Sequence, residues 1–325
     1  MSWPNDNKVL ALCGGVGGAK LALGLSHLLS PEQLTIVVNT GDDFEHFGLL
    51  ICPDLDTVTY TLAGICNTTT GWGRQDESWH CLEALQLLGA ETWFRLGDRD
   101  LGIHLARRAL LDQGRTLTEA TALITSQLGL AHNIVPMSDA AVRTMIDTDH
   151  GEISFQHYFV REQCKPAVRG IRFDGADDAT LSPGFEQALE DPGLAAILIC
   201  PSNPFVSVNP ILALPGTGDR LRQHKAPVVA VSPIVANKAI KGPAAKMMNE
   251  LGLESTALGI YQHYGDLLDG FVLDAQDRSL IDEVREPRHV HCCNTVMESL
   301  DDRIALAREC LQFAASLDGS GRRNR

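Results

Sequence analysis

The 325-residue sequence predicts a doubly wound α/β fold built on a mainly parallel sheet. KVLALCG has the pattern of a buried strand, AKLALGLSHLL repeats apolar residues at helical spacing, and LTIVVNT has the pattern of a second strand. Such a strand–helix–strand unit joins parallel strands by a right-handed crossover. The same rhythm returns in LAAILICPSNP and APVVAVSPIV. We therefore expect a Rossmann-like sheet that binds its ligand at the carboxyl ends of the strands.

The rest of the chain divides into further elements of this core and one segment of a different character. We expect late strands in DGFVLDAQD and RHVHCCNT, and helices in DTVTYTLAGI, HCLEALQLLG, DRDLGIHLARRALL, LTEATALITSQLGL, GPAAKMMNELG and SLDDRIALARECLQFAASL. GEISFQHYFVREQ and PAVRGIRFDG instead alternate like exposed strands, which indicates a small inserted α+β lobe. The predicted organisation is a first core part over 1–133, the lobe over 134–175, a second core part over 176–317 and a disordered tail over 318–325.

Composition narrows the class of protein. Hydrophobic residues make up 44% of the chain, which is enough for a substantial core, and the formal net charge is −14. This charge argues against binding to a nucleic-acid backbone, which requires an excess of Lys and Arg. The nine cysteines are scattered without a CxxC pair, as expected in the reducing cytoplasm. The longest apolar runs are too short to span a bilayer, so no membrane partner is expected.

The glycine-rich turn GGVGGAK lies between the first strand and the first helix. It departs from the dinucleotide fingerprint and from the Walker loop, because its spacing fits neither and Leu21 replaces the metal-binding hydroxyl. Backbone N–H groups at a helix N-terminus nevertheless favour an anion, and a lysine one turn into the helix adds positive charge. Tight helix–strand packing with a solvated lysine is the alternative. We assign phosphate binding to Gly14, Gly15, Gly17, Gly18 and Lys20.

Four aspartates fall near the same edge of the predicted sheet. Asp42 and Asp43 follow the second strand, and Asp54 and Asp56 precede an apolar helix. Taken singly, Asp56 has the ordinary role of a helix cap and Asp54 that of a turn residue. Together, beside a phosphate loop without a metal-binding hydroxyl, they predict an oxygen-rich site for Mg²⁺. We assign the metal to Asp54 and Asp56.

Three further loops carry polar side chains. Arg95 follows the apolar pair WF, so we expect it at a strand end facing the site, whereas the neighbouring Arg99 and Asp100 fit a solvated ion pair equally well. The loop CPSNPFVSVNP offers side chains that can read a base or ribose, namely Ser202, Asn203, Ser207 and Asn209. A second anion clamp is predicted from the basic residues near a later helix start, Lys238, Lys241 and Lys246.

These segments together resemble one family. GGVGGAK, VVNTGDDF, PDLDTV, RLGDRD, NIVPMSD, VRGIRF, PSNP, VSPI and GPAAKMM occur in the order found in the 2-phospho-L-lactate transferases of the coenzyme F-420 pathway. The resemblance runs from about Val9 to the C-terminal helix. It implies a transferase that moves a phospho-acid group from a guanosine-diphospho-activated three-carbon acid to the terminal ribityl hydroxyl of Fo (7,8-didemethyl-8-hydroxy-5-deazariboflavin). GMP leaves, and Mg²⁺ is required.

The resemblance also implies roles for individual residues. Asp56, in PDLDT, matches a position that contacts Fo near the reacting hydroxyl, where it orients or deprotonates that group or holds the metal. Arg95 matches an Fo-contacting position that is usually lysine in the family. We assign Asp42 and Asp43 to the same acceptor side. The nucleotide side is assigned, from strand-end placement and the family pattern, to the glycine loop, Lys20, Asn203 and Lys246.

Three matters stay open from sequence. The donor acid is phospholactate, phosphoenolpyruvate or 3-phosphoglycerate, and no residue chooses between them. A homodimer is expected from the resemblance alone. The main alternative function is a non-catalytic nucleotide- or nucleotide-sugar-binding regulator from a related family with a similar glycine-rich start. A dehydrogenase is disfavoured, because the fingerprint fails and no acidic residue ends LTIVVNT.

Overall fold

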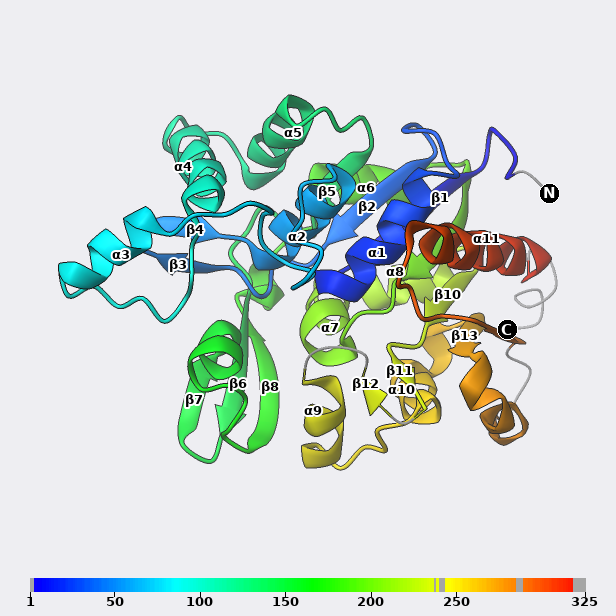
Figure 1. The fold of residues 1–325 in the computed structure, drawn as a ribbon. Helices are drawn as coiled ribbons and strands as arrows, with labels where there is room; N and C mark the ends of the chain where they lie inside the picture. The colour runs from blue at the N-terminus through cyan, green and yellow to red at the C-terminus, as the bar shows by residue number, and fades with distance from the viewer. Residues whose placement is uncertain (1–2, 237, 240–242, 285–288, 318–325) are drawn as a thin grey trace.

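A single parallel sheet forms the centre of the molecule (Figure 1). The computed structural model describes residues 3–236, 238–239, 243–284 and 289–317. Within this part of the chain the sheet has seven strands in the order β14-β13-β10-β9-β1-β2-β5, and every neighbouring pair is parallel. Their bounds are β1 Lys8–Cys13, β2 Leu34–Val38, β5 Asn133–Pro136, β9 Leu194–Ile199, β10 Val228–Val231, β13 Gly270–Asp274 and β14 His289–Cys293. The predicted doubly wound α/β class is confirmed.

The strand order reverses beside β1. From β1 the chain builds outward through β2 and β5, and it later returns to add β9, β10, β13 and β14 on the other side. Loops that leave adjacent strands in opposite directions open a crevice at such a reversal. The expected ligand position is therefore the carboxyl end of β1 and β9.

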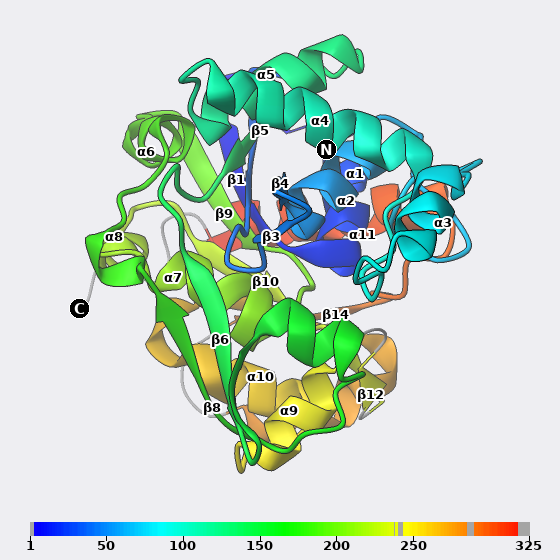
Figure 2. The ribbon, with the colours of Figure 1, turned by 90° about the vertical axis from the view of Figure 1, so that its left-hand side faces the viewer.

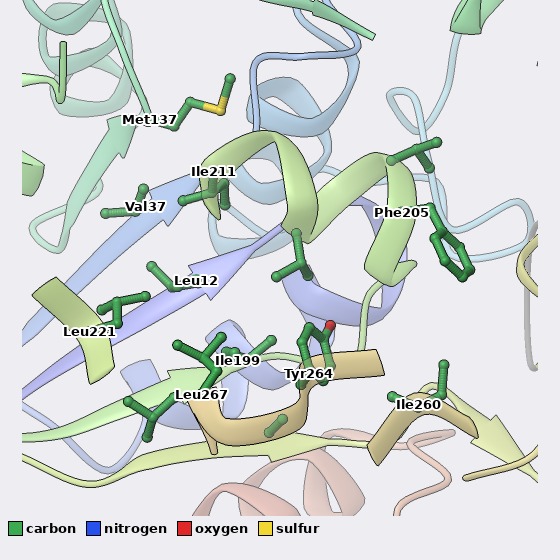
Figure 3. Packing of buried hydrophobic residues seen from close by; sticks show 14 of the residues in the cluster. Leu12, Val37, Met137, Ile199, Phe205, Ile211, Leu221, Ile260, Tyr264 and Leu267 are labelled. Carbon is green, nitrogen blue, oxygen red and sulfur yellow. The ribbon is translucent and has the colours of Figure 1, made fainter. Parts of the chain in front are cut away.

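Helices cover both faces because the side chains of each buried strand alternate between them. Val9, Ala11 and Cys13 of β1 face a layer formed by α1 (Gly15–Ser26), α2 (Pro53–Leu62) and α11 (Leu300–Leu317). Leu10 and Leu12 face the opposite core, part of which is drawn in Figure 3. The helices on that side are α6 Pro183–Glu190, α7 Asn209–Leu212, α8 Thr217–Gln223, α9 Ala244–Glu250 and α10 Ala257–Tyr264. Each large apolar side chain buried this way stabilises the fold by about 1.5–3 kcal/mol.

A small antiparallel sheet lies apart from the main one. It consists of β7 (Gly151–Ser154), β6 (Arg143–Thr148) and β8 (Val168–Asp174) in that order, and Figure 2 shows β6 and β8 side by side. This sheet falls within the predicted lobe of 134–175. Residues 134–136, however, pair with β2 as part of β5, so the lobe sheet starts later than the proposed boundary. GEISFQHYFVREQ is a strand only as far as Ser154 and then forms a helical turn.

The segment between β2 and β5 forms a cap beside the carboxyl end of the sheet (Figure 1). It contains the hairpin β3 (Phe44–His46) and β4 (Leu49–Ile51), together with α3 (His80–Leu87), α4 (Asp98–Asp112) and α5 (Leu117–Gln127). Thr116 and Glu119 form a capping box at the start of α5. α3, α4 and α5 match the helices predicted for this segment. Elsewhere in the fold, a short hairpin follows β10 and consists of β11 Ile234–Val235 and β12 Lys238–Ala239.

Two further expectations concern the C-terminal tail and membrane-spanning segments. The tail over 318–325 lies outside the described residues. In the part of the chain that the structure describes, no helix combines the length and the apolar character needed to cross a membrane.

Candidate functional site

A cavity of about 660 Å³ opens at the carboxyl ends of the strands. Its floor is formed by the loops after β1, β2, β9, β10 and β14, and its sides by α2, the cap and the lobe. This is the position expected where strand order reverses. The volume suits a small-molecule ligand pair.

The glycine turn is shaped by close contact with the loop after β9. Gly15 has φ +54°, which favours glycine, and a Cβ at Gly17 would collide with the carbonyl oxygen of Pro201. Ser202 Oγ donates to Gly14 O at 2.6 Å and accepts from Gly14 N at 3.2 Å. The glycines therefore permit tight packing, and three of them line the cavity at a helix N-terminus, where phosphate binding stays a prediction.

The other two members of the predicted phosphate loop differ in their position. Gly18 is buried, and a Cβ there would lie 2.7 Å from Ser202 Oγ, so its role is packing. Lys20 lines the cavity, and its Nζ donates to Met297 O at 2.6 Å. This hydrogen bond holds the lysine charge at the wall formed by α1 and the loop after β14.

Asp42 and Asp54 form a buried acidic pair in the cavity. Asn39 Nδ2 donates to Asp54 Oδ2 at 2.9 Å, and Asp54 Oδ1 lies against Gly15. Burial raises the pKa of Asp54 to about 6, although hydrogen bonds from Asn39 and from the Gly15 backbone oppose the shift. Burial and then the nearby Asp54 charge raise the pKa of Asp42 well above its usual range. Two carboxylates are thus held together with little charge compensation.

Asp43 is also buried but does not line the cavity. Burial raises its pKa to about 7, and the charge of Arg143 opposes this rise. Asp43 therefore differs from Asp42, which lines the cavity, although the sequence analysis assigned both residues to the acceptor side.

Asp42 and Asp54 fit a magnesium ion better than the predicted pair Asp54 and Asp56. Oδ1 of Asp42 is buried and has no hydrogen-bond partner within the described structure. Magnesium is commonly held by one or two carboxylates together with substrate phosphates and water. The described residues contain no group of three or more His, Cys, Asp or Glu side chains arranged to hold a metal by themselves. A metal here would therefore need oxygens from the substrate.

Asp56 is paired with a buried arginine that sequence analysis did not identify. Pro53 starts α2, and Asp56 in its first turn complements the helix dipole. Arg107 of α4 donates from Nη2 to Oδ1 of Asp56 and from Nη1 to Oδ2 at 3.3 Å. Burial is the largest influence on the pKa of Arg107 and lowers it, but the charges of Asp56 and Cys52 and the hydrogen bond to Asp56 together raise it, so the guanidinium stays charged. Both Asp56 oxygens therefore contact one cation, unlike those of Asp54.

Three more polar side chains, those of His104, Asp100 and Tyr60, extend the contact between Asp56 and Arg107. His104 Nδ1 lies 3.2 Å from Arg107 Nη1, and His104 Nε2 lies 3.4 Å from Asp100 Oδ2. Tyr60 of α2 donates its hydroxyl hydrogen to Asp100 Oδ1. Asp100, His104 and Arg107 lie at i, i+4 and i+7 and so share one face of α4. The spacing of Asp100, His104 and Arg107 in DRDLGIHLARR is the sequence signal that could have identified this group. The sequence analysis instead gave a solvated ion pair as one alternative for Asp100.

Aromatic side chains form the wall of the cavity that the lobe and the cap contribute. The Phe155 and Phe159 rings from the lobe stack with centroids 5.5 Å apart. Further aromatic lining residues come from the cap: Trp72, Trp93 and Phe94. Such a wall suits a flat conjugated ring.

Arg95 lies at the edge of this wall but not at a strand end. No strand covers its segment, and its guanidinium is 4.1 Å from the Trp79 ring centroid. The following motif has a structural use, because Asp98 accepts hydrogen bonds from the backbone N–H groups of His80 and Cys81 at the start of α3. Arg95 does line the cavity, as its assigned role requires.

Of the second predicted anion clamp, Lys246 is the member whose side chain the structure describes, and it does not line the cavity. Asn203 and Ser207 line the cavity, and Asn203 Oδ1 accepts from Phe205 N at 3.0 Å. Lys246 does not line the cavity, because its Nζ donates to Tyr158 Oη at 3.1 Å and pairs with Glu250 one turn along α9. Lys241 and the side chain of Lys238 lie outside the described residues.

The fold and cavity define an α/β protein whose ligand site lies where strand order reverses in a Rossmann-like sheet. The chain belongs to the CofD family: residues 9–304 match the family described as 2-phospho-L-lactate transferase CofD. This assignment covers nearly the whole described core, and it confirms the resemblance inferred from the motifs.

Named relatives and a solved structure agree with the assignment. The chain is 38% identical over 307 residues to a 2-phospho-L-lactate transferase from Methanosarcina mazei, covering 94% of this chain and 99% of that protein. It is 37% identical over 316 residues to a phosphoenolpyruvate transferase from Streptomyces griseus, covering 94% and 98%. A UPF0052 family protein from Bacillus halodurans has the same fold, with a TM-score of 0.59 and 14% identity over 94% of this chain and 98% of that chain.

The protein is therefore a transferase enzyme of the CofD type. Its family implies a substrate pair made of a phospho-acid donor and an acceptor. The relatives' names refer to two different phospho-acids, so similarity alone does not select the acid. The identity to named transferases favours an enzyme over the alternative of a non-catalytic regulator.

Proposed function

We propose that the protein transfers the phospho-acid portion of a guanosine-diphospho-activated three-carbon acid to the terminal ribityl hydroxyl of Fo, as in coenzyme F-420 biosynthesis. The acceptor oxygen forms a bond to the phosphorus that bears the acid, the bond from this phosphorus to GMP breaks, the hydroxyl proton passes to the solvent, and GMP leaves. The observation that carries the proposal is one cavity with a cationic, glycine-lined end and an aromatic wall. These two ends match a nucleotide diphosphate and a flat deazaflavin.

The diphosphate is proposed to bind at the N-terminus of α1. Gly14, Gly15 and Gly17 line the cavity there, and Lys20 supplies positive charge from the same helix. A helix N-terminus favours an anion through its free N–H groups and its dipole. Asn203 and Ser207, on the adjoining loop, offer polar groups to the nucleoside.

Asp42 and Asp54 are proposed to hold Mg²⁺ together with the diphosphate. When bound, the ion neutralises charge on the phosphate oxygens and so favours departure of GMP. Both carboxylates are buried and repel each other, so a cation between them would relieve that repulsion. Asp56 has its charge matched by Arg107 instead, which suits a carboxylate that accepts a hydrogen bond from the acceptor hydroxyl and orients it.

A magnesium titration tests the metal assignment without any turnover. With GDP present to supply phosphate oxygens, we expect Mg²⁺ to raise the melting temperature of the wild type and to leave that of Asp42→Asn and Asp54→Asn nearly unchanged. Asp112→Asn, at an exposed position on α4, is the matched control and should respond like the wild type. An equal rise in all four proteins would place the ion elsewhere.

An endpoint assay by mass spectrometry tests the reaction. The protein is incubated with Mg²⁺, Fo and, in turn, the guanosine-activated forms of 2-phospholactate, phosphoenolpyruvate and 3-phosphoglycerate. A product with the mass of Fo plus one phospho-acid minus one water supports the proposal and identifies the donor. No product from any donor, with no binding of Fo, would contradict it.

Two binding measurements test the ends of the cavity. Lys20→Ala should weaken GDP binding more than Fo binding, whereas Lys225→Ala, at an exposed position away from the cavity, should change neither. Unchanged GDP affinity in the Lys20 variant would contradict the phosphate-loop assignment.

Two further properties are also proposed. The resemblance to the family implies a homodimer, which light scattering after size exclusion tests. The composition of the chain favours a cytoplasmic location.

A further inference from the structure

One buried group near the cavity has no role in the reaction proposed above. Arg107 is 4% exposed, does not line the cavity and reaches Asp56 from another helix. It also donates from Nη1 to Leu50 O at 3.2 Å, so the guanidinium is fixed to the end of the β3–β4 hairpin as well. Its position is therefore set independently of any ligand.

The contacts of Arg107 determine where the Asp56 carboxylate points. A planar guanidinium that contacts both oxygens fixes the carboxylate plane as well as its distance. Without this pair, Asp56 could rotate about its side-chain bonds within the first turn of α2. The lone pairs that Arg107 does not use remain available to the cavity, which Asp56 lines.

Arg107 is in turn held by a chain of polar contacts between α4 and α2. His104 is 1% exposed and lies between Arg107 and Asp100, and Tyr60 ties Asp100 back to the helix that carries Asp56. His104 Nδ1 lies within hydrogen-bond distance of Arg107 Nη1, and Nε2 lies 3.4 Å from Asp100 Oδ2 without a hydrogen bond in the described structure. Polar contacts therefore join α4 to α2 at two residues of α2, Asp56 and Tyr60, which lie one turn apart.

We propose that Arg107, supported by His104 and Asp100, is a positioning residue that sets the orientation of Asp56 for transfer. This inference rests on the proposed function, in which Asp56 orients the acceptor hydroxyl. The cap helix α4 is then part of the reaction geometry, although only its Asp100 and His104 reach the cavity. Misplacement of a reacting group by about 1 Å lowers the rate by roughly 100-fold, so the expected effect is large.

The test is a double-mutant cycle with Arg107→Met and Asp56→Asn. We expect Arg107→Met to lower kcat by about 100-fold with an unchanged KM for the donor, and Arg107→Lys to recover part of the loss. Asp56→Asn/Arg107→Met should be about as active as Asp56→Asn alone, because both changes remove one function. Arg108→Met, the exposed neighbour on α4, is the matched control and should retain wild-type kcat.

The possible results separate the inference from the proposed function. If Arg107→Met does not fold, the double variant decides, because it removes both charges of the buried pair. A double variant that folds and loses a further tenfold or more relative to Asp56→Asn would overturn the inference. If the wild type transfers nothing, the proposed function fails, and a crystal structure of Arg107→Lys still decides on positioning. A rotated Asp56 carboxylate there supports the inference, and an unmoved one overturns it.

Discussion

Replacement of Asp56 by Asn should destabilise the protein measurably, because it leaves the Arg107 charge buried without a counter-charge. The Asp56 and Arg107 side chains are only 8% and 4% exposed. Removing one partner of a buried ion pair costs about 3–5 kcal/mol. Asn keeps one oxygen that can accept from Arg107, so we expect the lower end, about 3 kcal/mol. This loss arises in the folded state, whether or not a ligand is bound.

The corresponding change in melting temperature follows from the size of the chain. At about 2.1 cal/mol/K per residue, 325 residues unfold with an entropy of about 0.7 kcal/mol/K. A loss of 3 kcal/mol therefore lowers Tm by about 4 °C. The assay is thermal unfolding at pH 7, followed by circular dichroism.

Two variants control this measurement. Asp112→Asn breaks an exposed pair with Arg108 and should change Tm by less than about 1 °C. Asp56→Asn/Arg107→Met removes both buried charges and should recover most of the loss. If Asp56→Asn melts within 1 °C of the wild type, the pair is not desolvated in solution and the reasoning on Asp56 is wrong.

Three further predictions concern glycines and one carboxylate. Gly17→Ala should weaken GDP binding by more than about tenfold in calorimetry, because its Cβ would collide with the Pro201 carbonyl and displace the loop; unchanged affinity would contradict this. Gly102→Ala, in the exposed interior of α4 with open space around its Cβ, should raise stability by about 1 kcal/mol in urea unfolding, and a loss would contradict it. The raised pKa of Asp43, about 7, means that the folded protein binds a proton that the unfolded chain loses near pH 4, so stability falls as pH rises from about 4 to 7. In magnesium-free buffer the free energy of unfolding of Asp43→Asn, relative to the wild type, should therefore be higher at pH 8 than at pH 5 by on the order of 3 kcal/mol, and an equal difference at both pH values would refute it.

Local pattern was sufficient to predict the core of the fold. β1, α1 and β2 are each specified by their own apolar periodicity, and a strand–helix–strand unit has one favoured handedness. The edge of the sheet where ligands bind then follows from topology, so the glycine turn and Asp54 were correctly expected at one site. These features depend on neighbours in sequence.

The features that were missed depend on contacts between distant segments. Arg107 and Asp56 are 51 positions apart, and their pairing exists only because α4, which packs against β4 and α5, brings Arg107 to the first turn of α2. Lys246 was expected at the cavity from its place near a helix start, but its partner Glu250 lies one turn further along the same helix. Residue 134, the predicted start of the lobe, belongs to β5, and only the pairing of β5 with β2 assigns it to the main sheet.

The aspartates at the cavity differ chiefly in how their charge is compensated, and this difference limits what each can do. Asp42 and Asp54 are buried together with no described cation opposite either of them, which raises the pKa of both and favours a divalent ion as their third partner. Asp56 already has its cation in Arg107, so a metal would have to compete with a guanidinium that contacts both oxygens. A carboxylate compensated in this way keeps its orientation and its charge while the ligand changes, which is what alignment of a neutral hydroxyl requires. Of the three roles open to Asp56 from sequence, this compensation favours the orientation that we propose, and replacement of Asp56 should lower kcat while magnesium-dependent stabilisation remains.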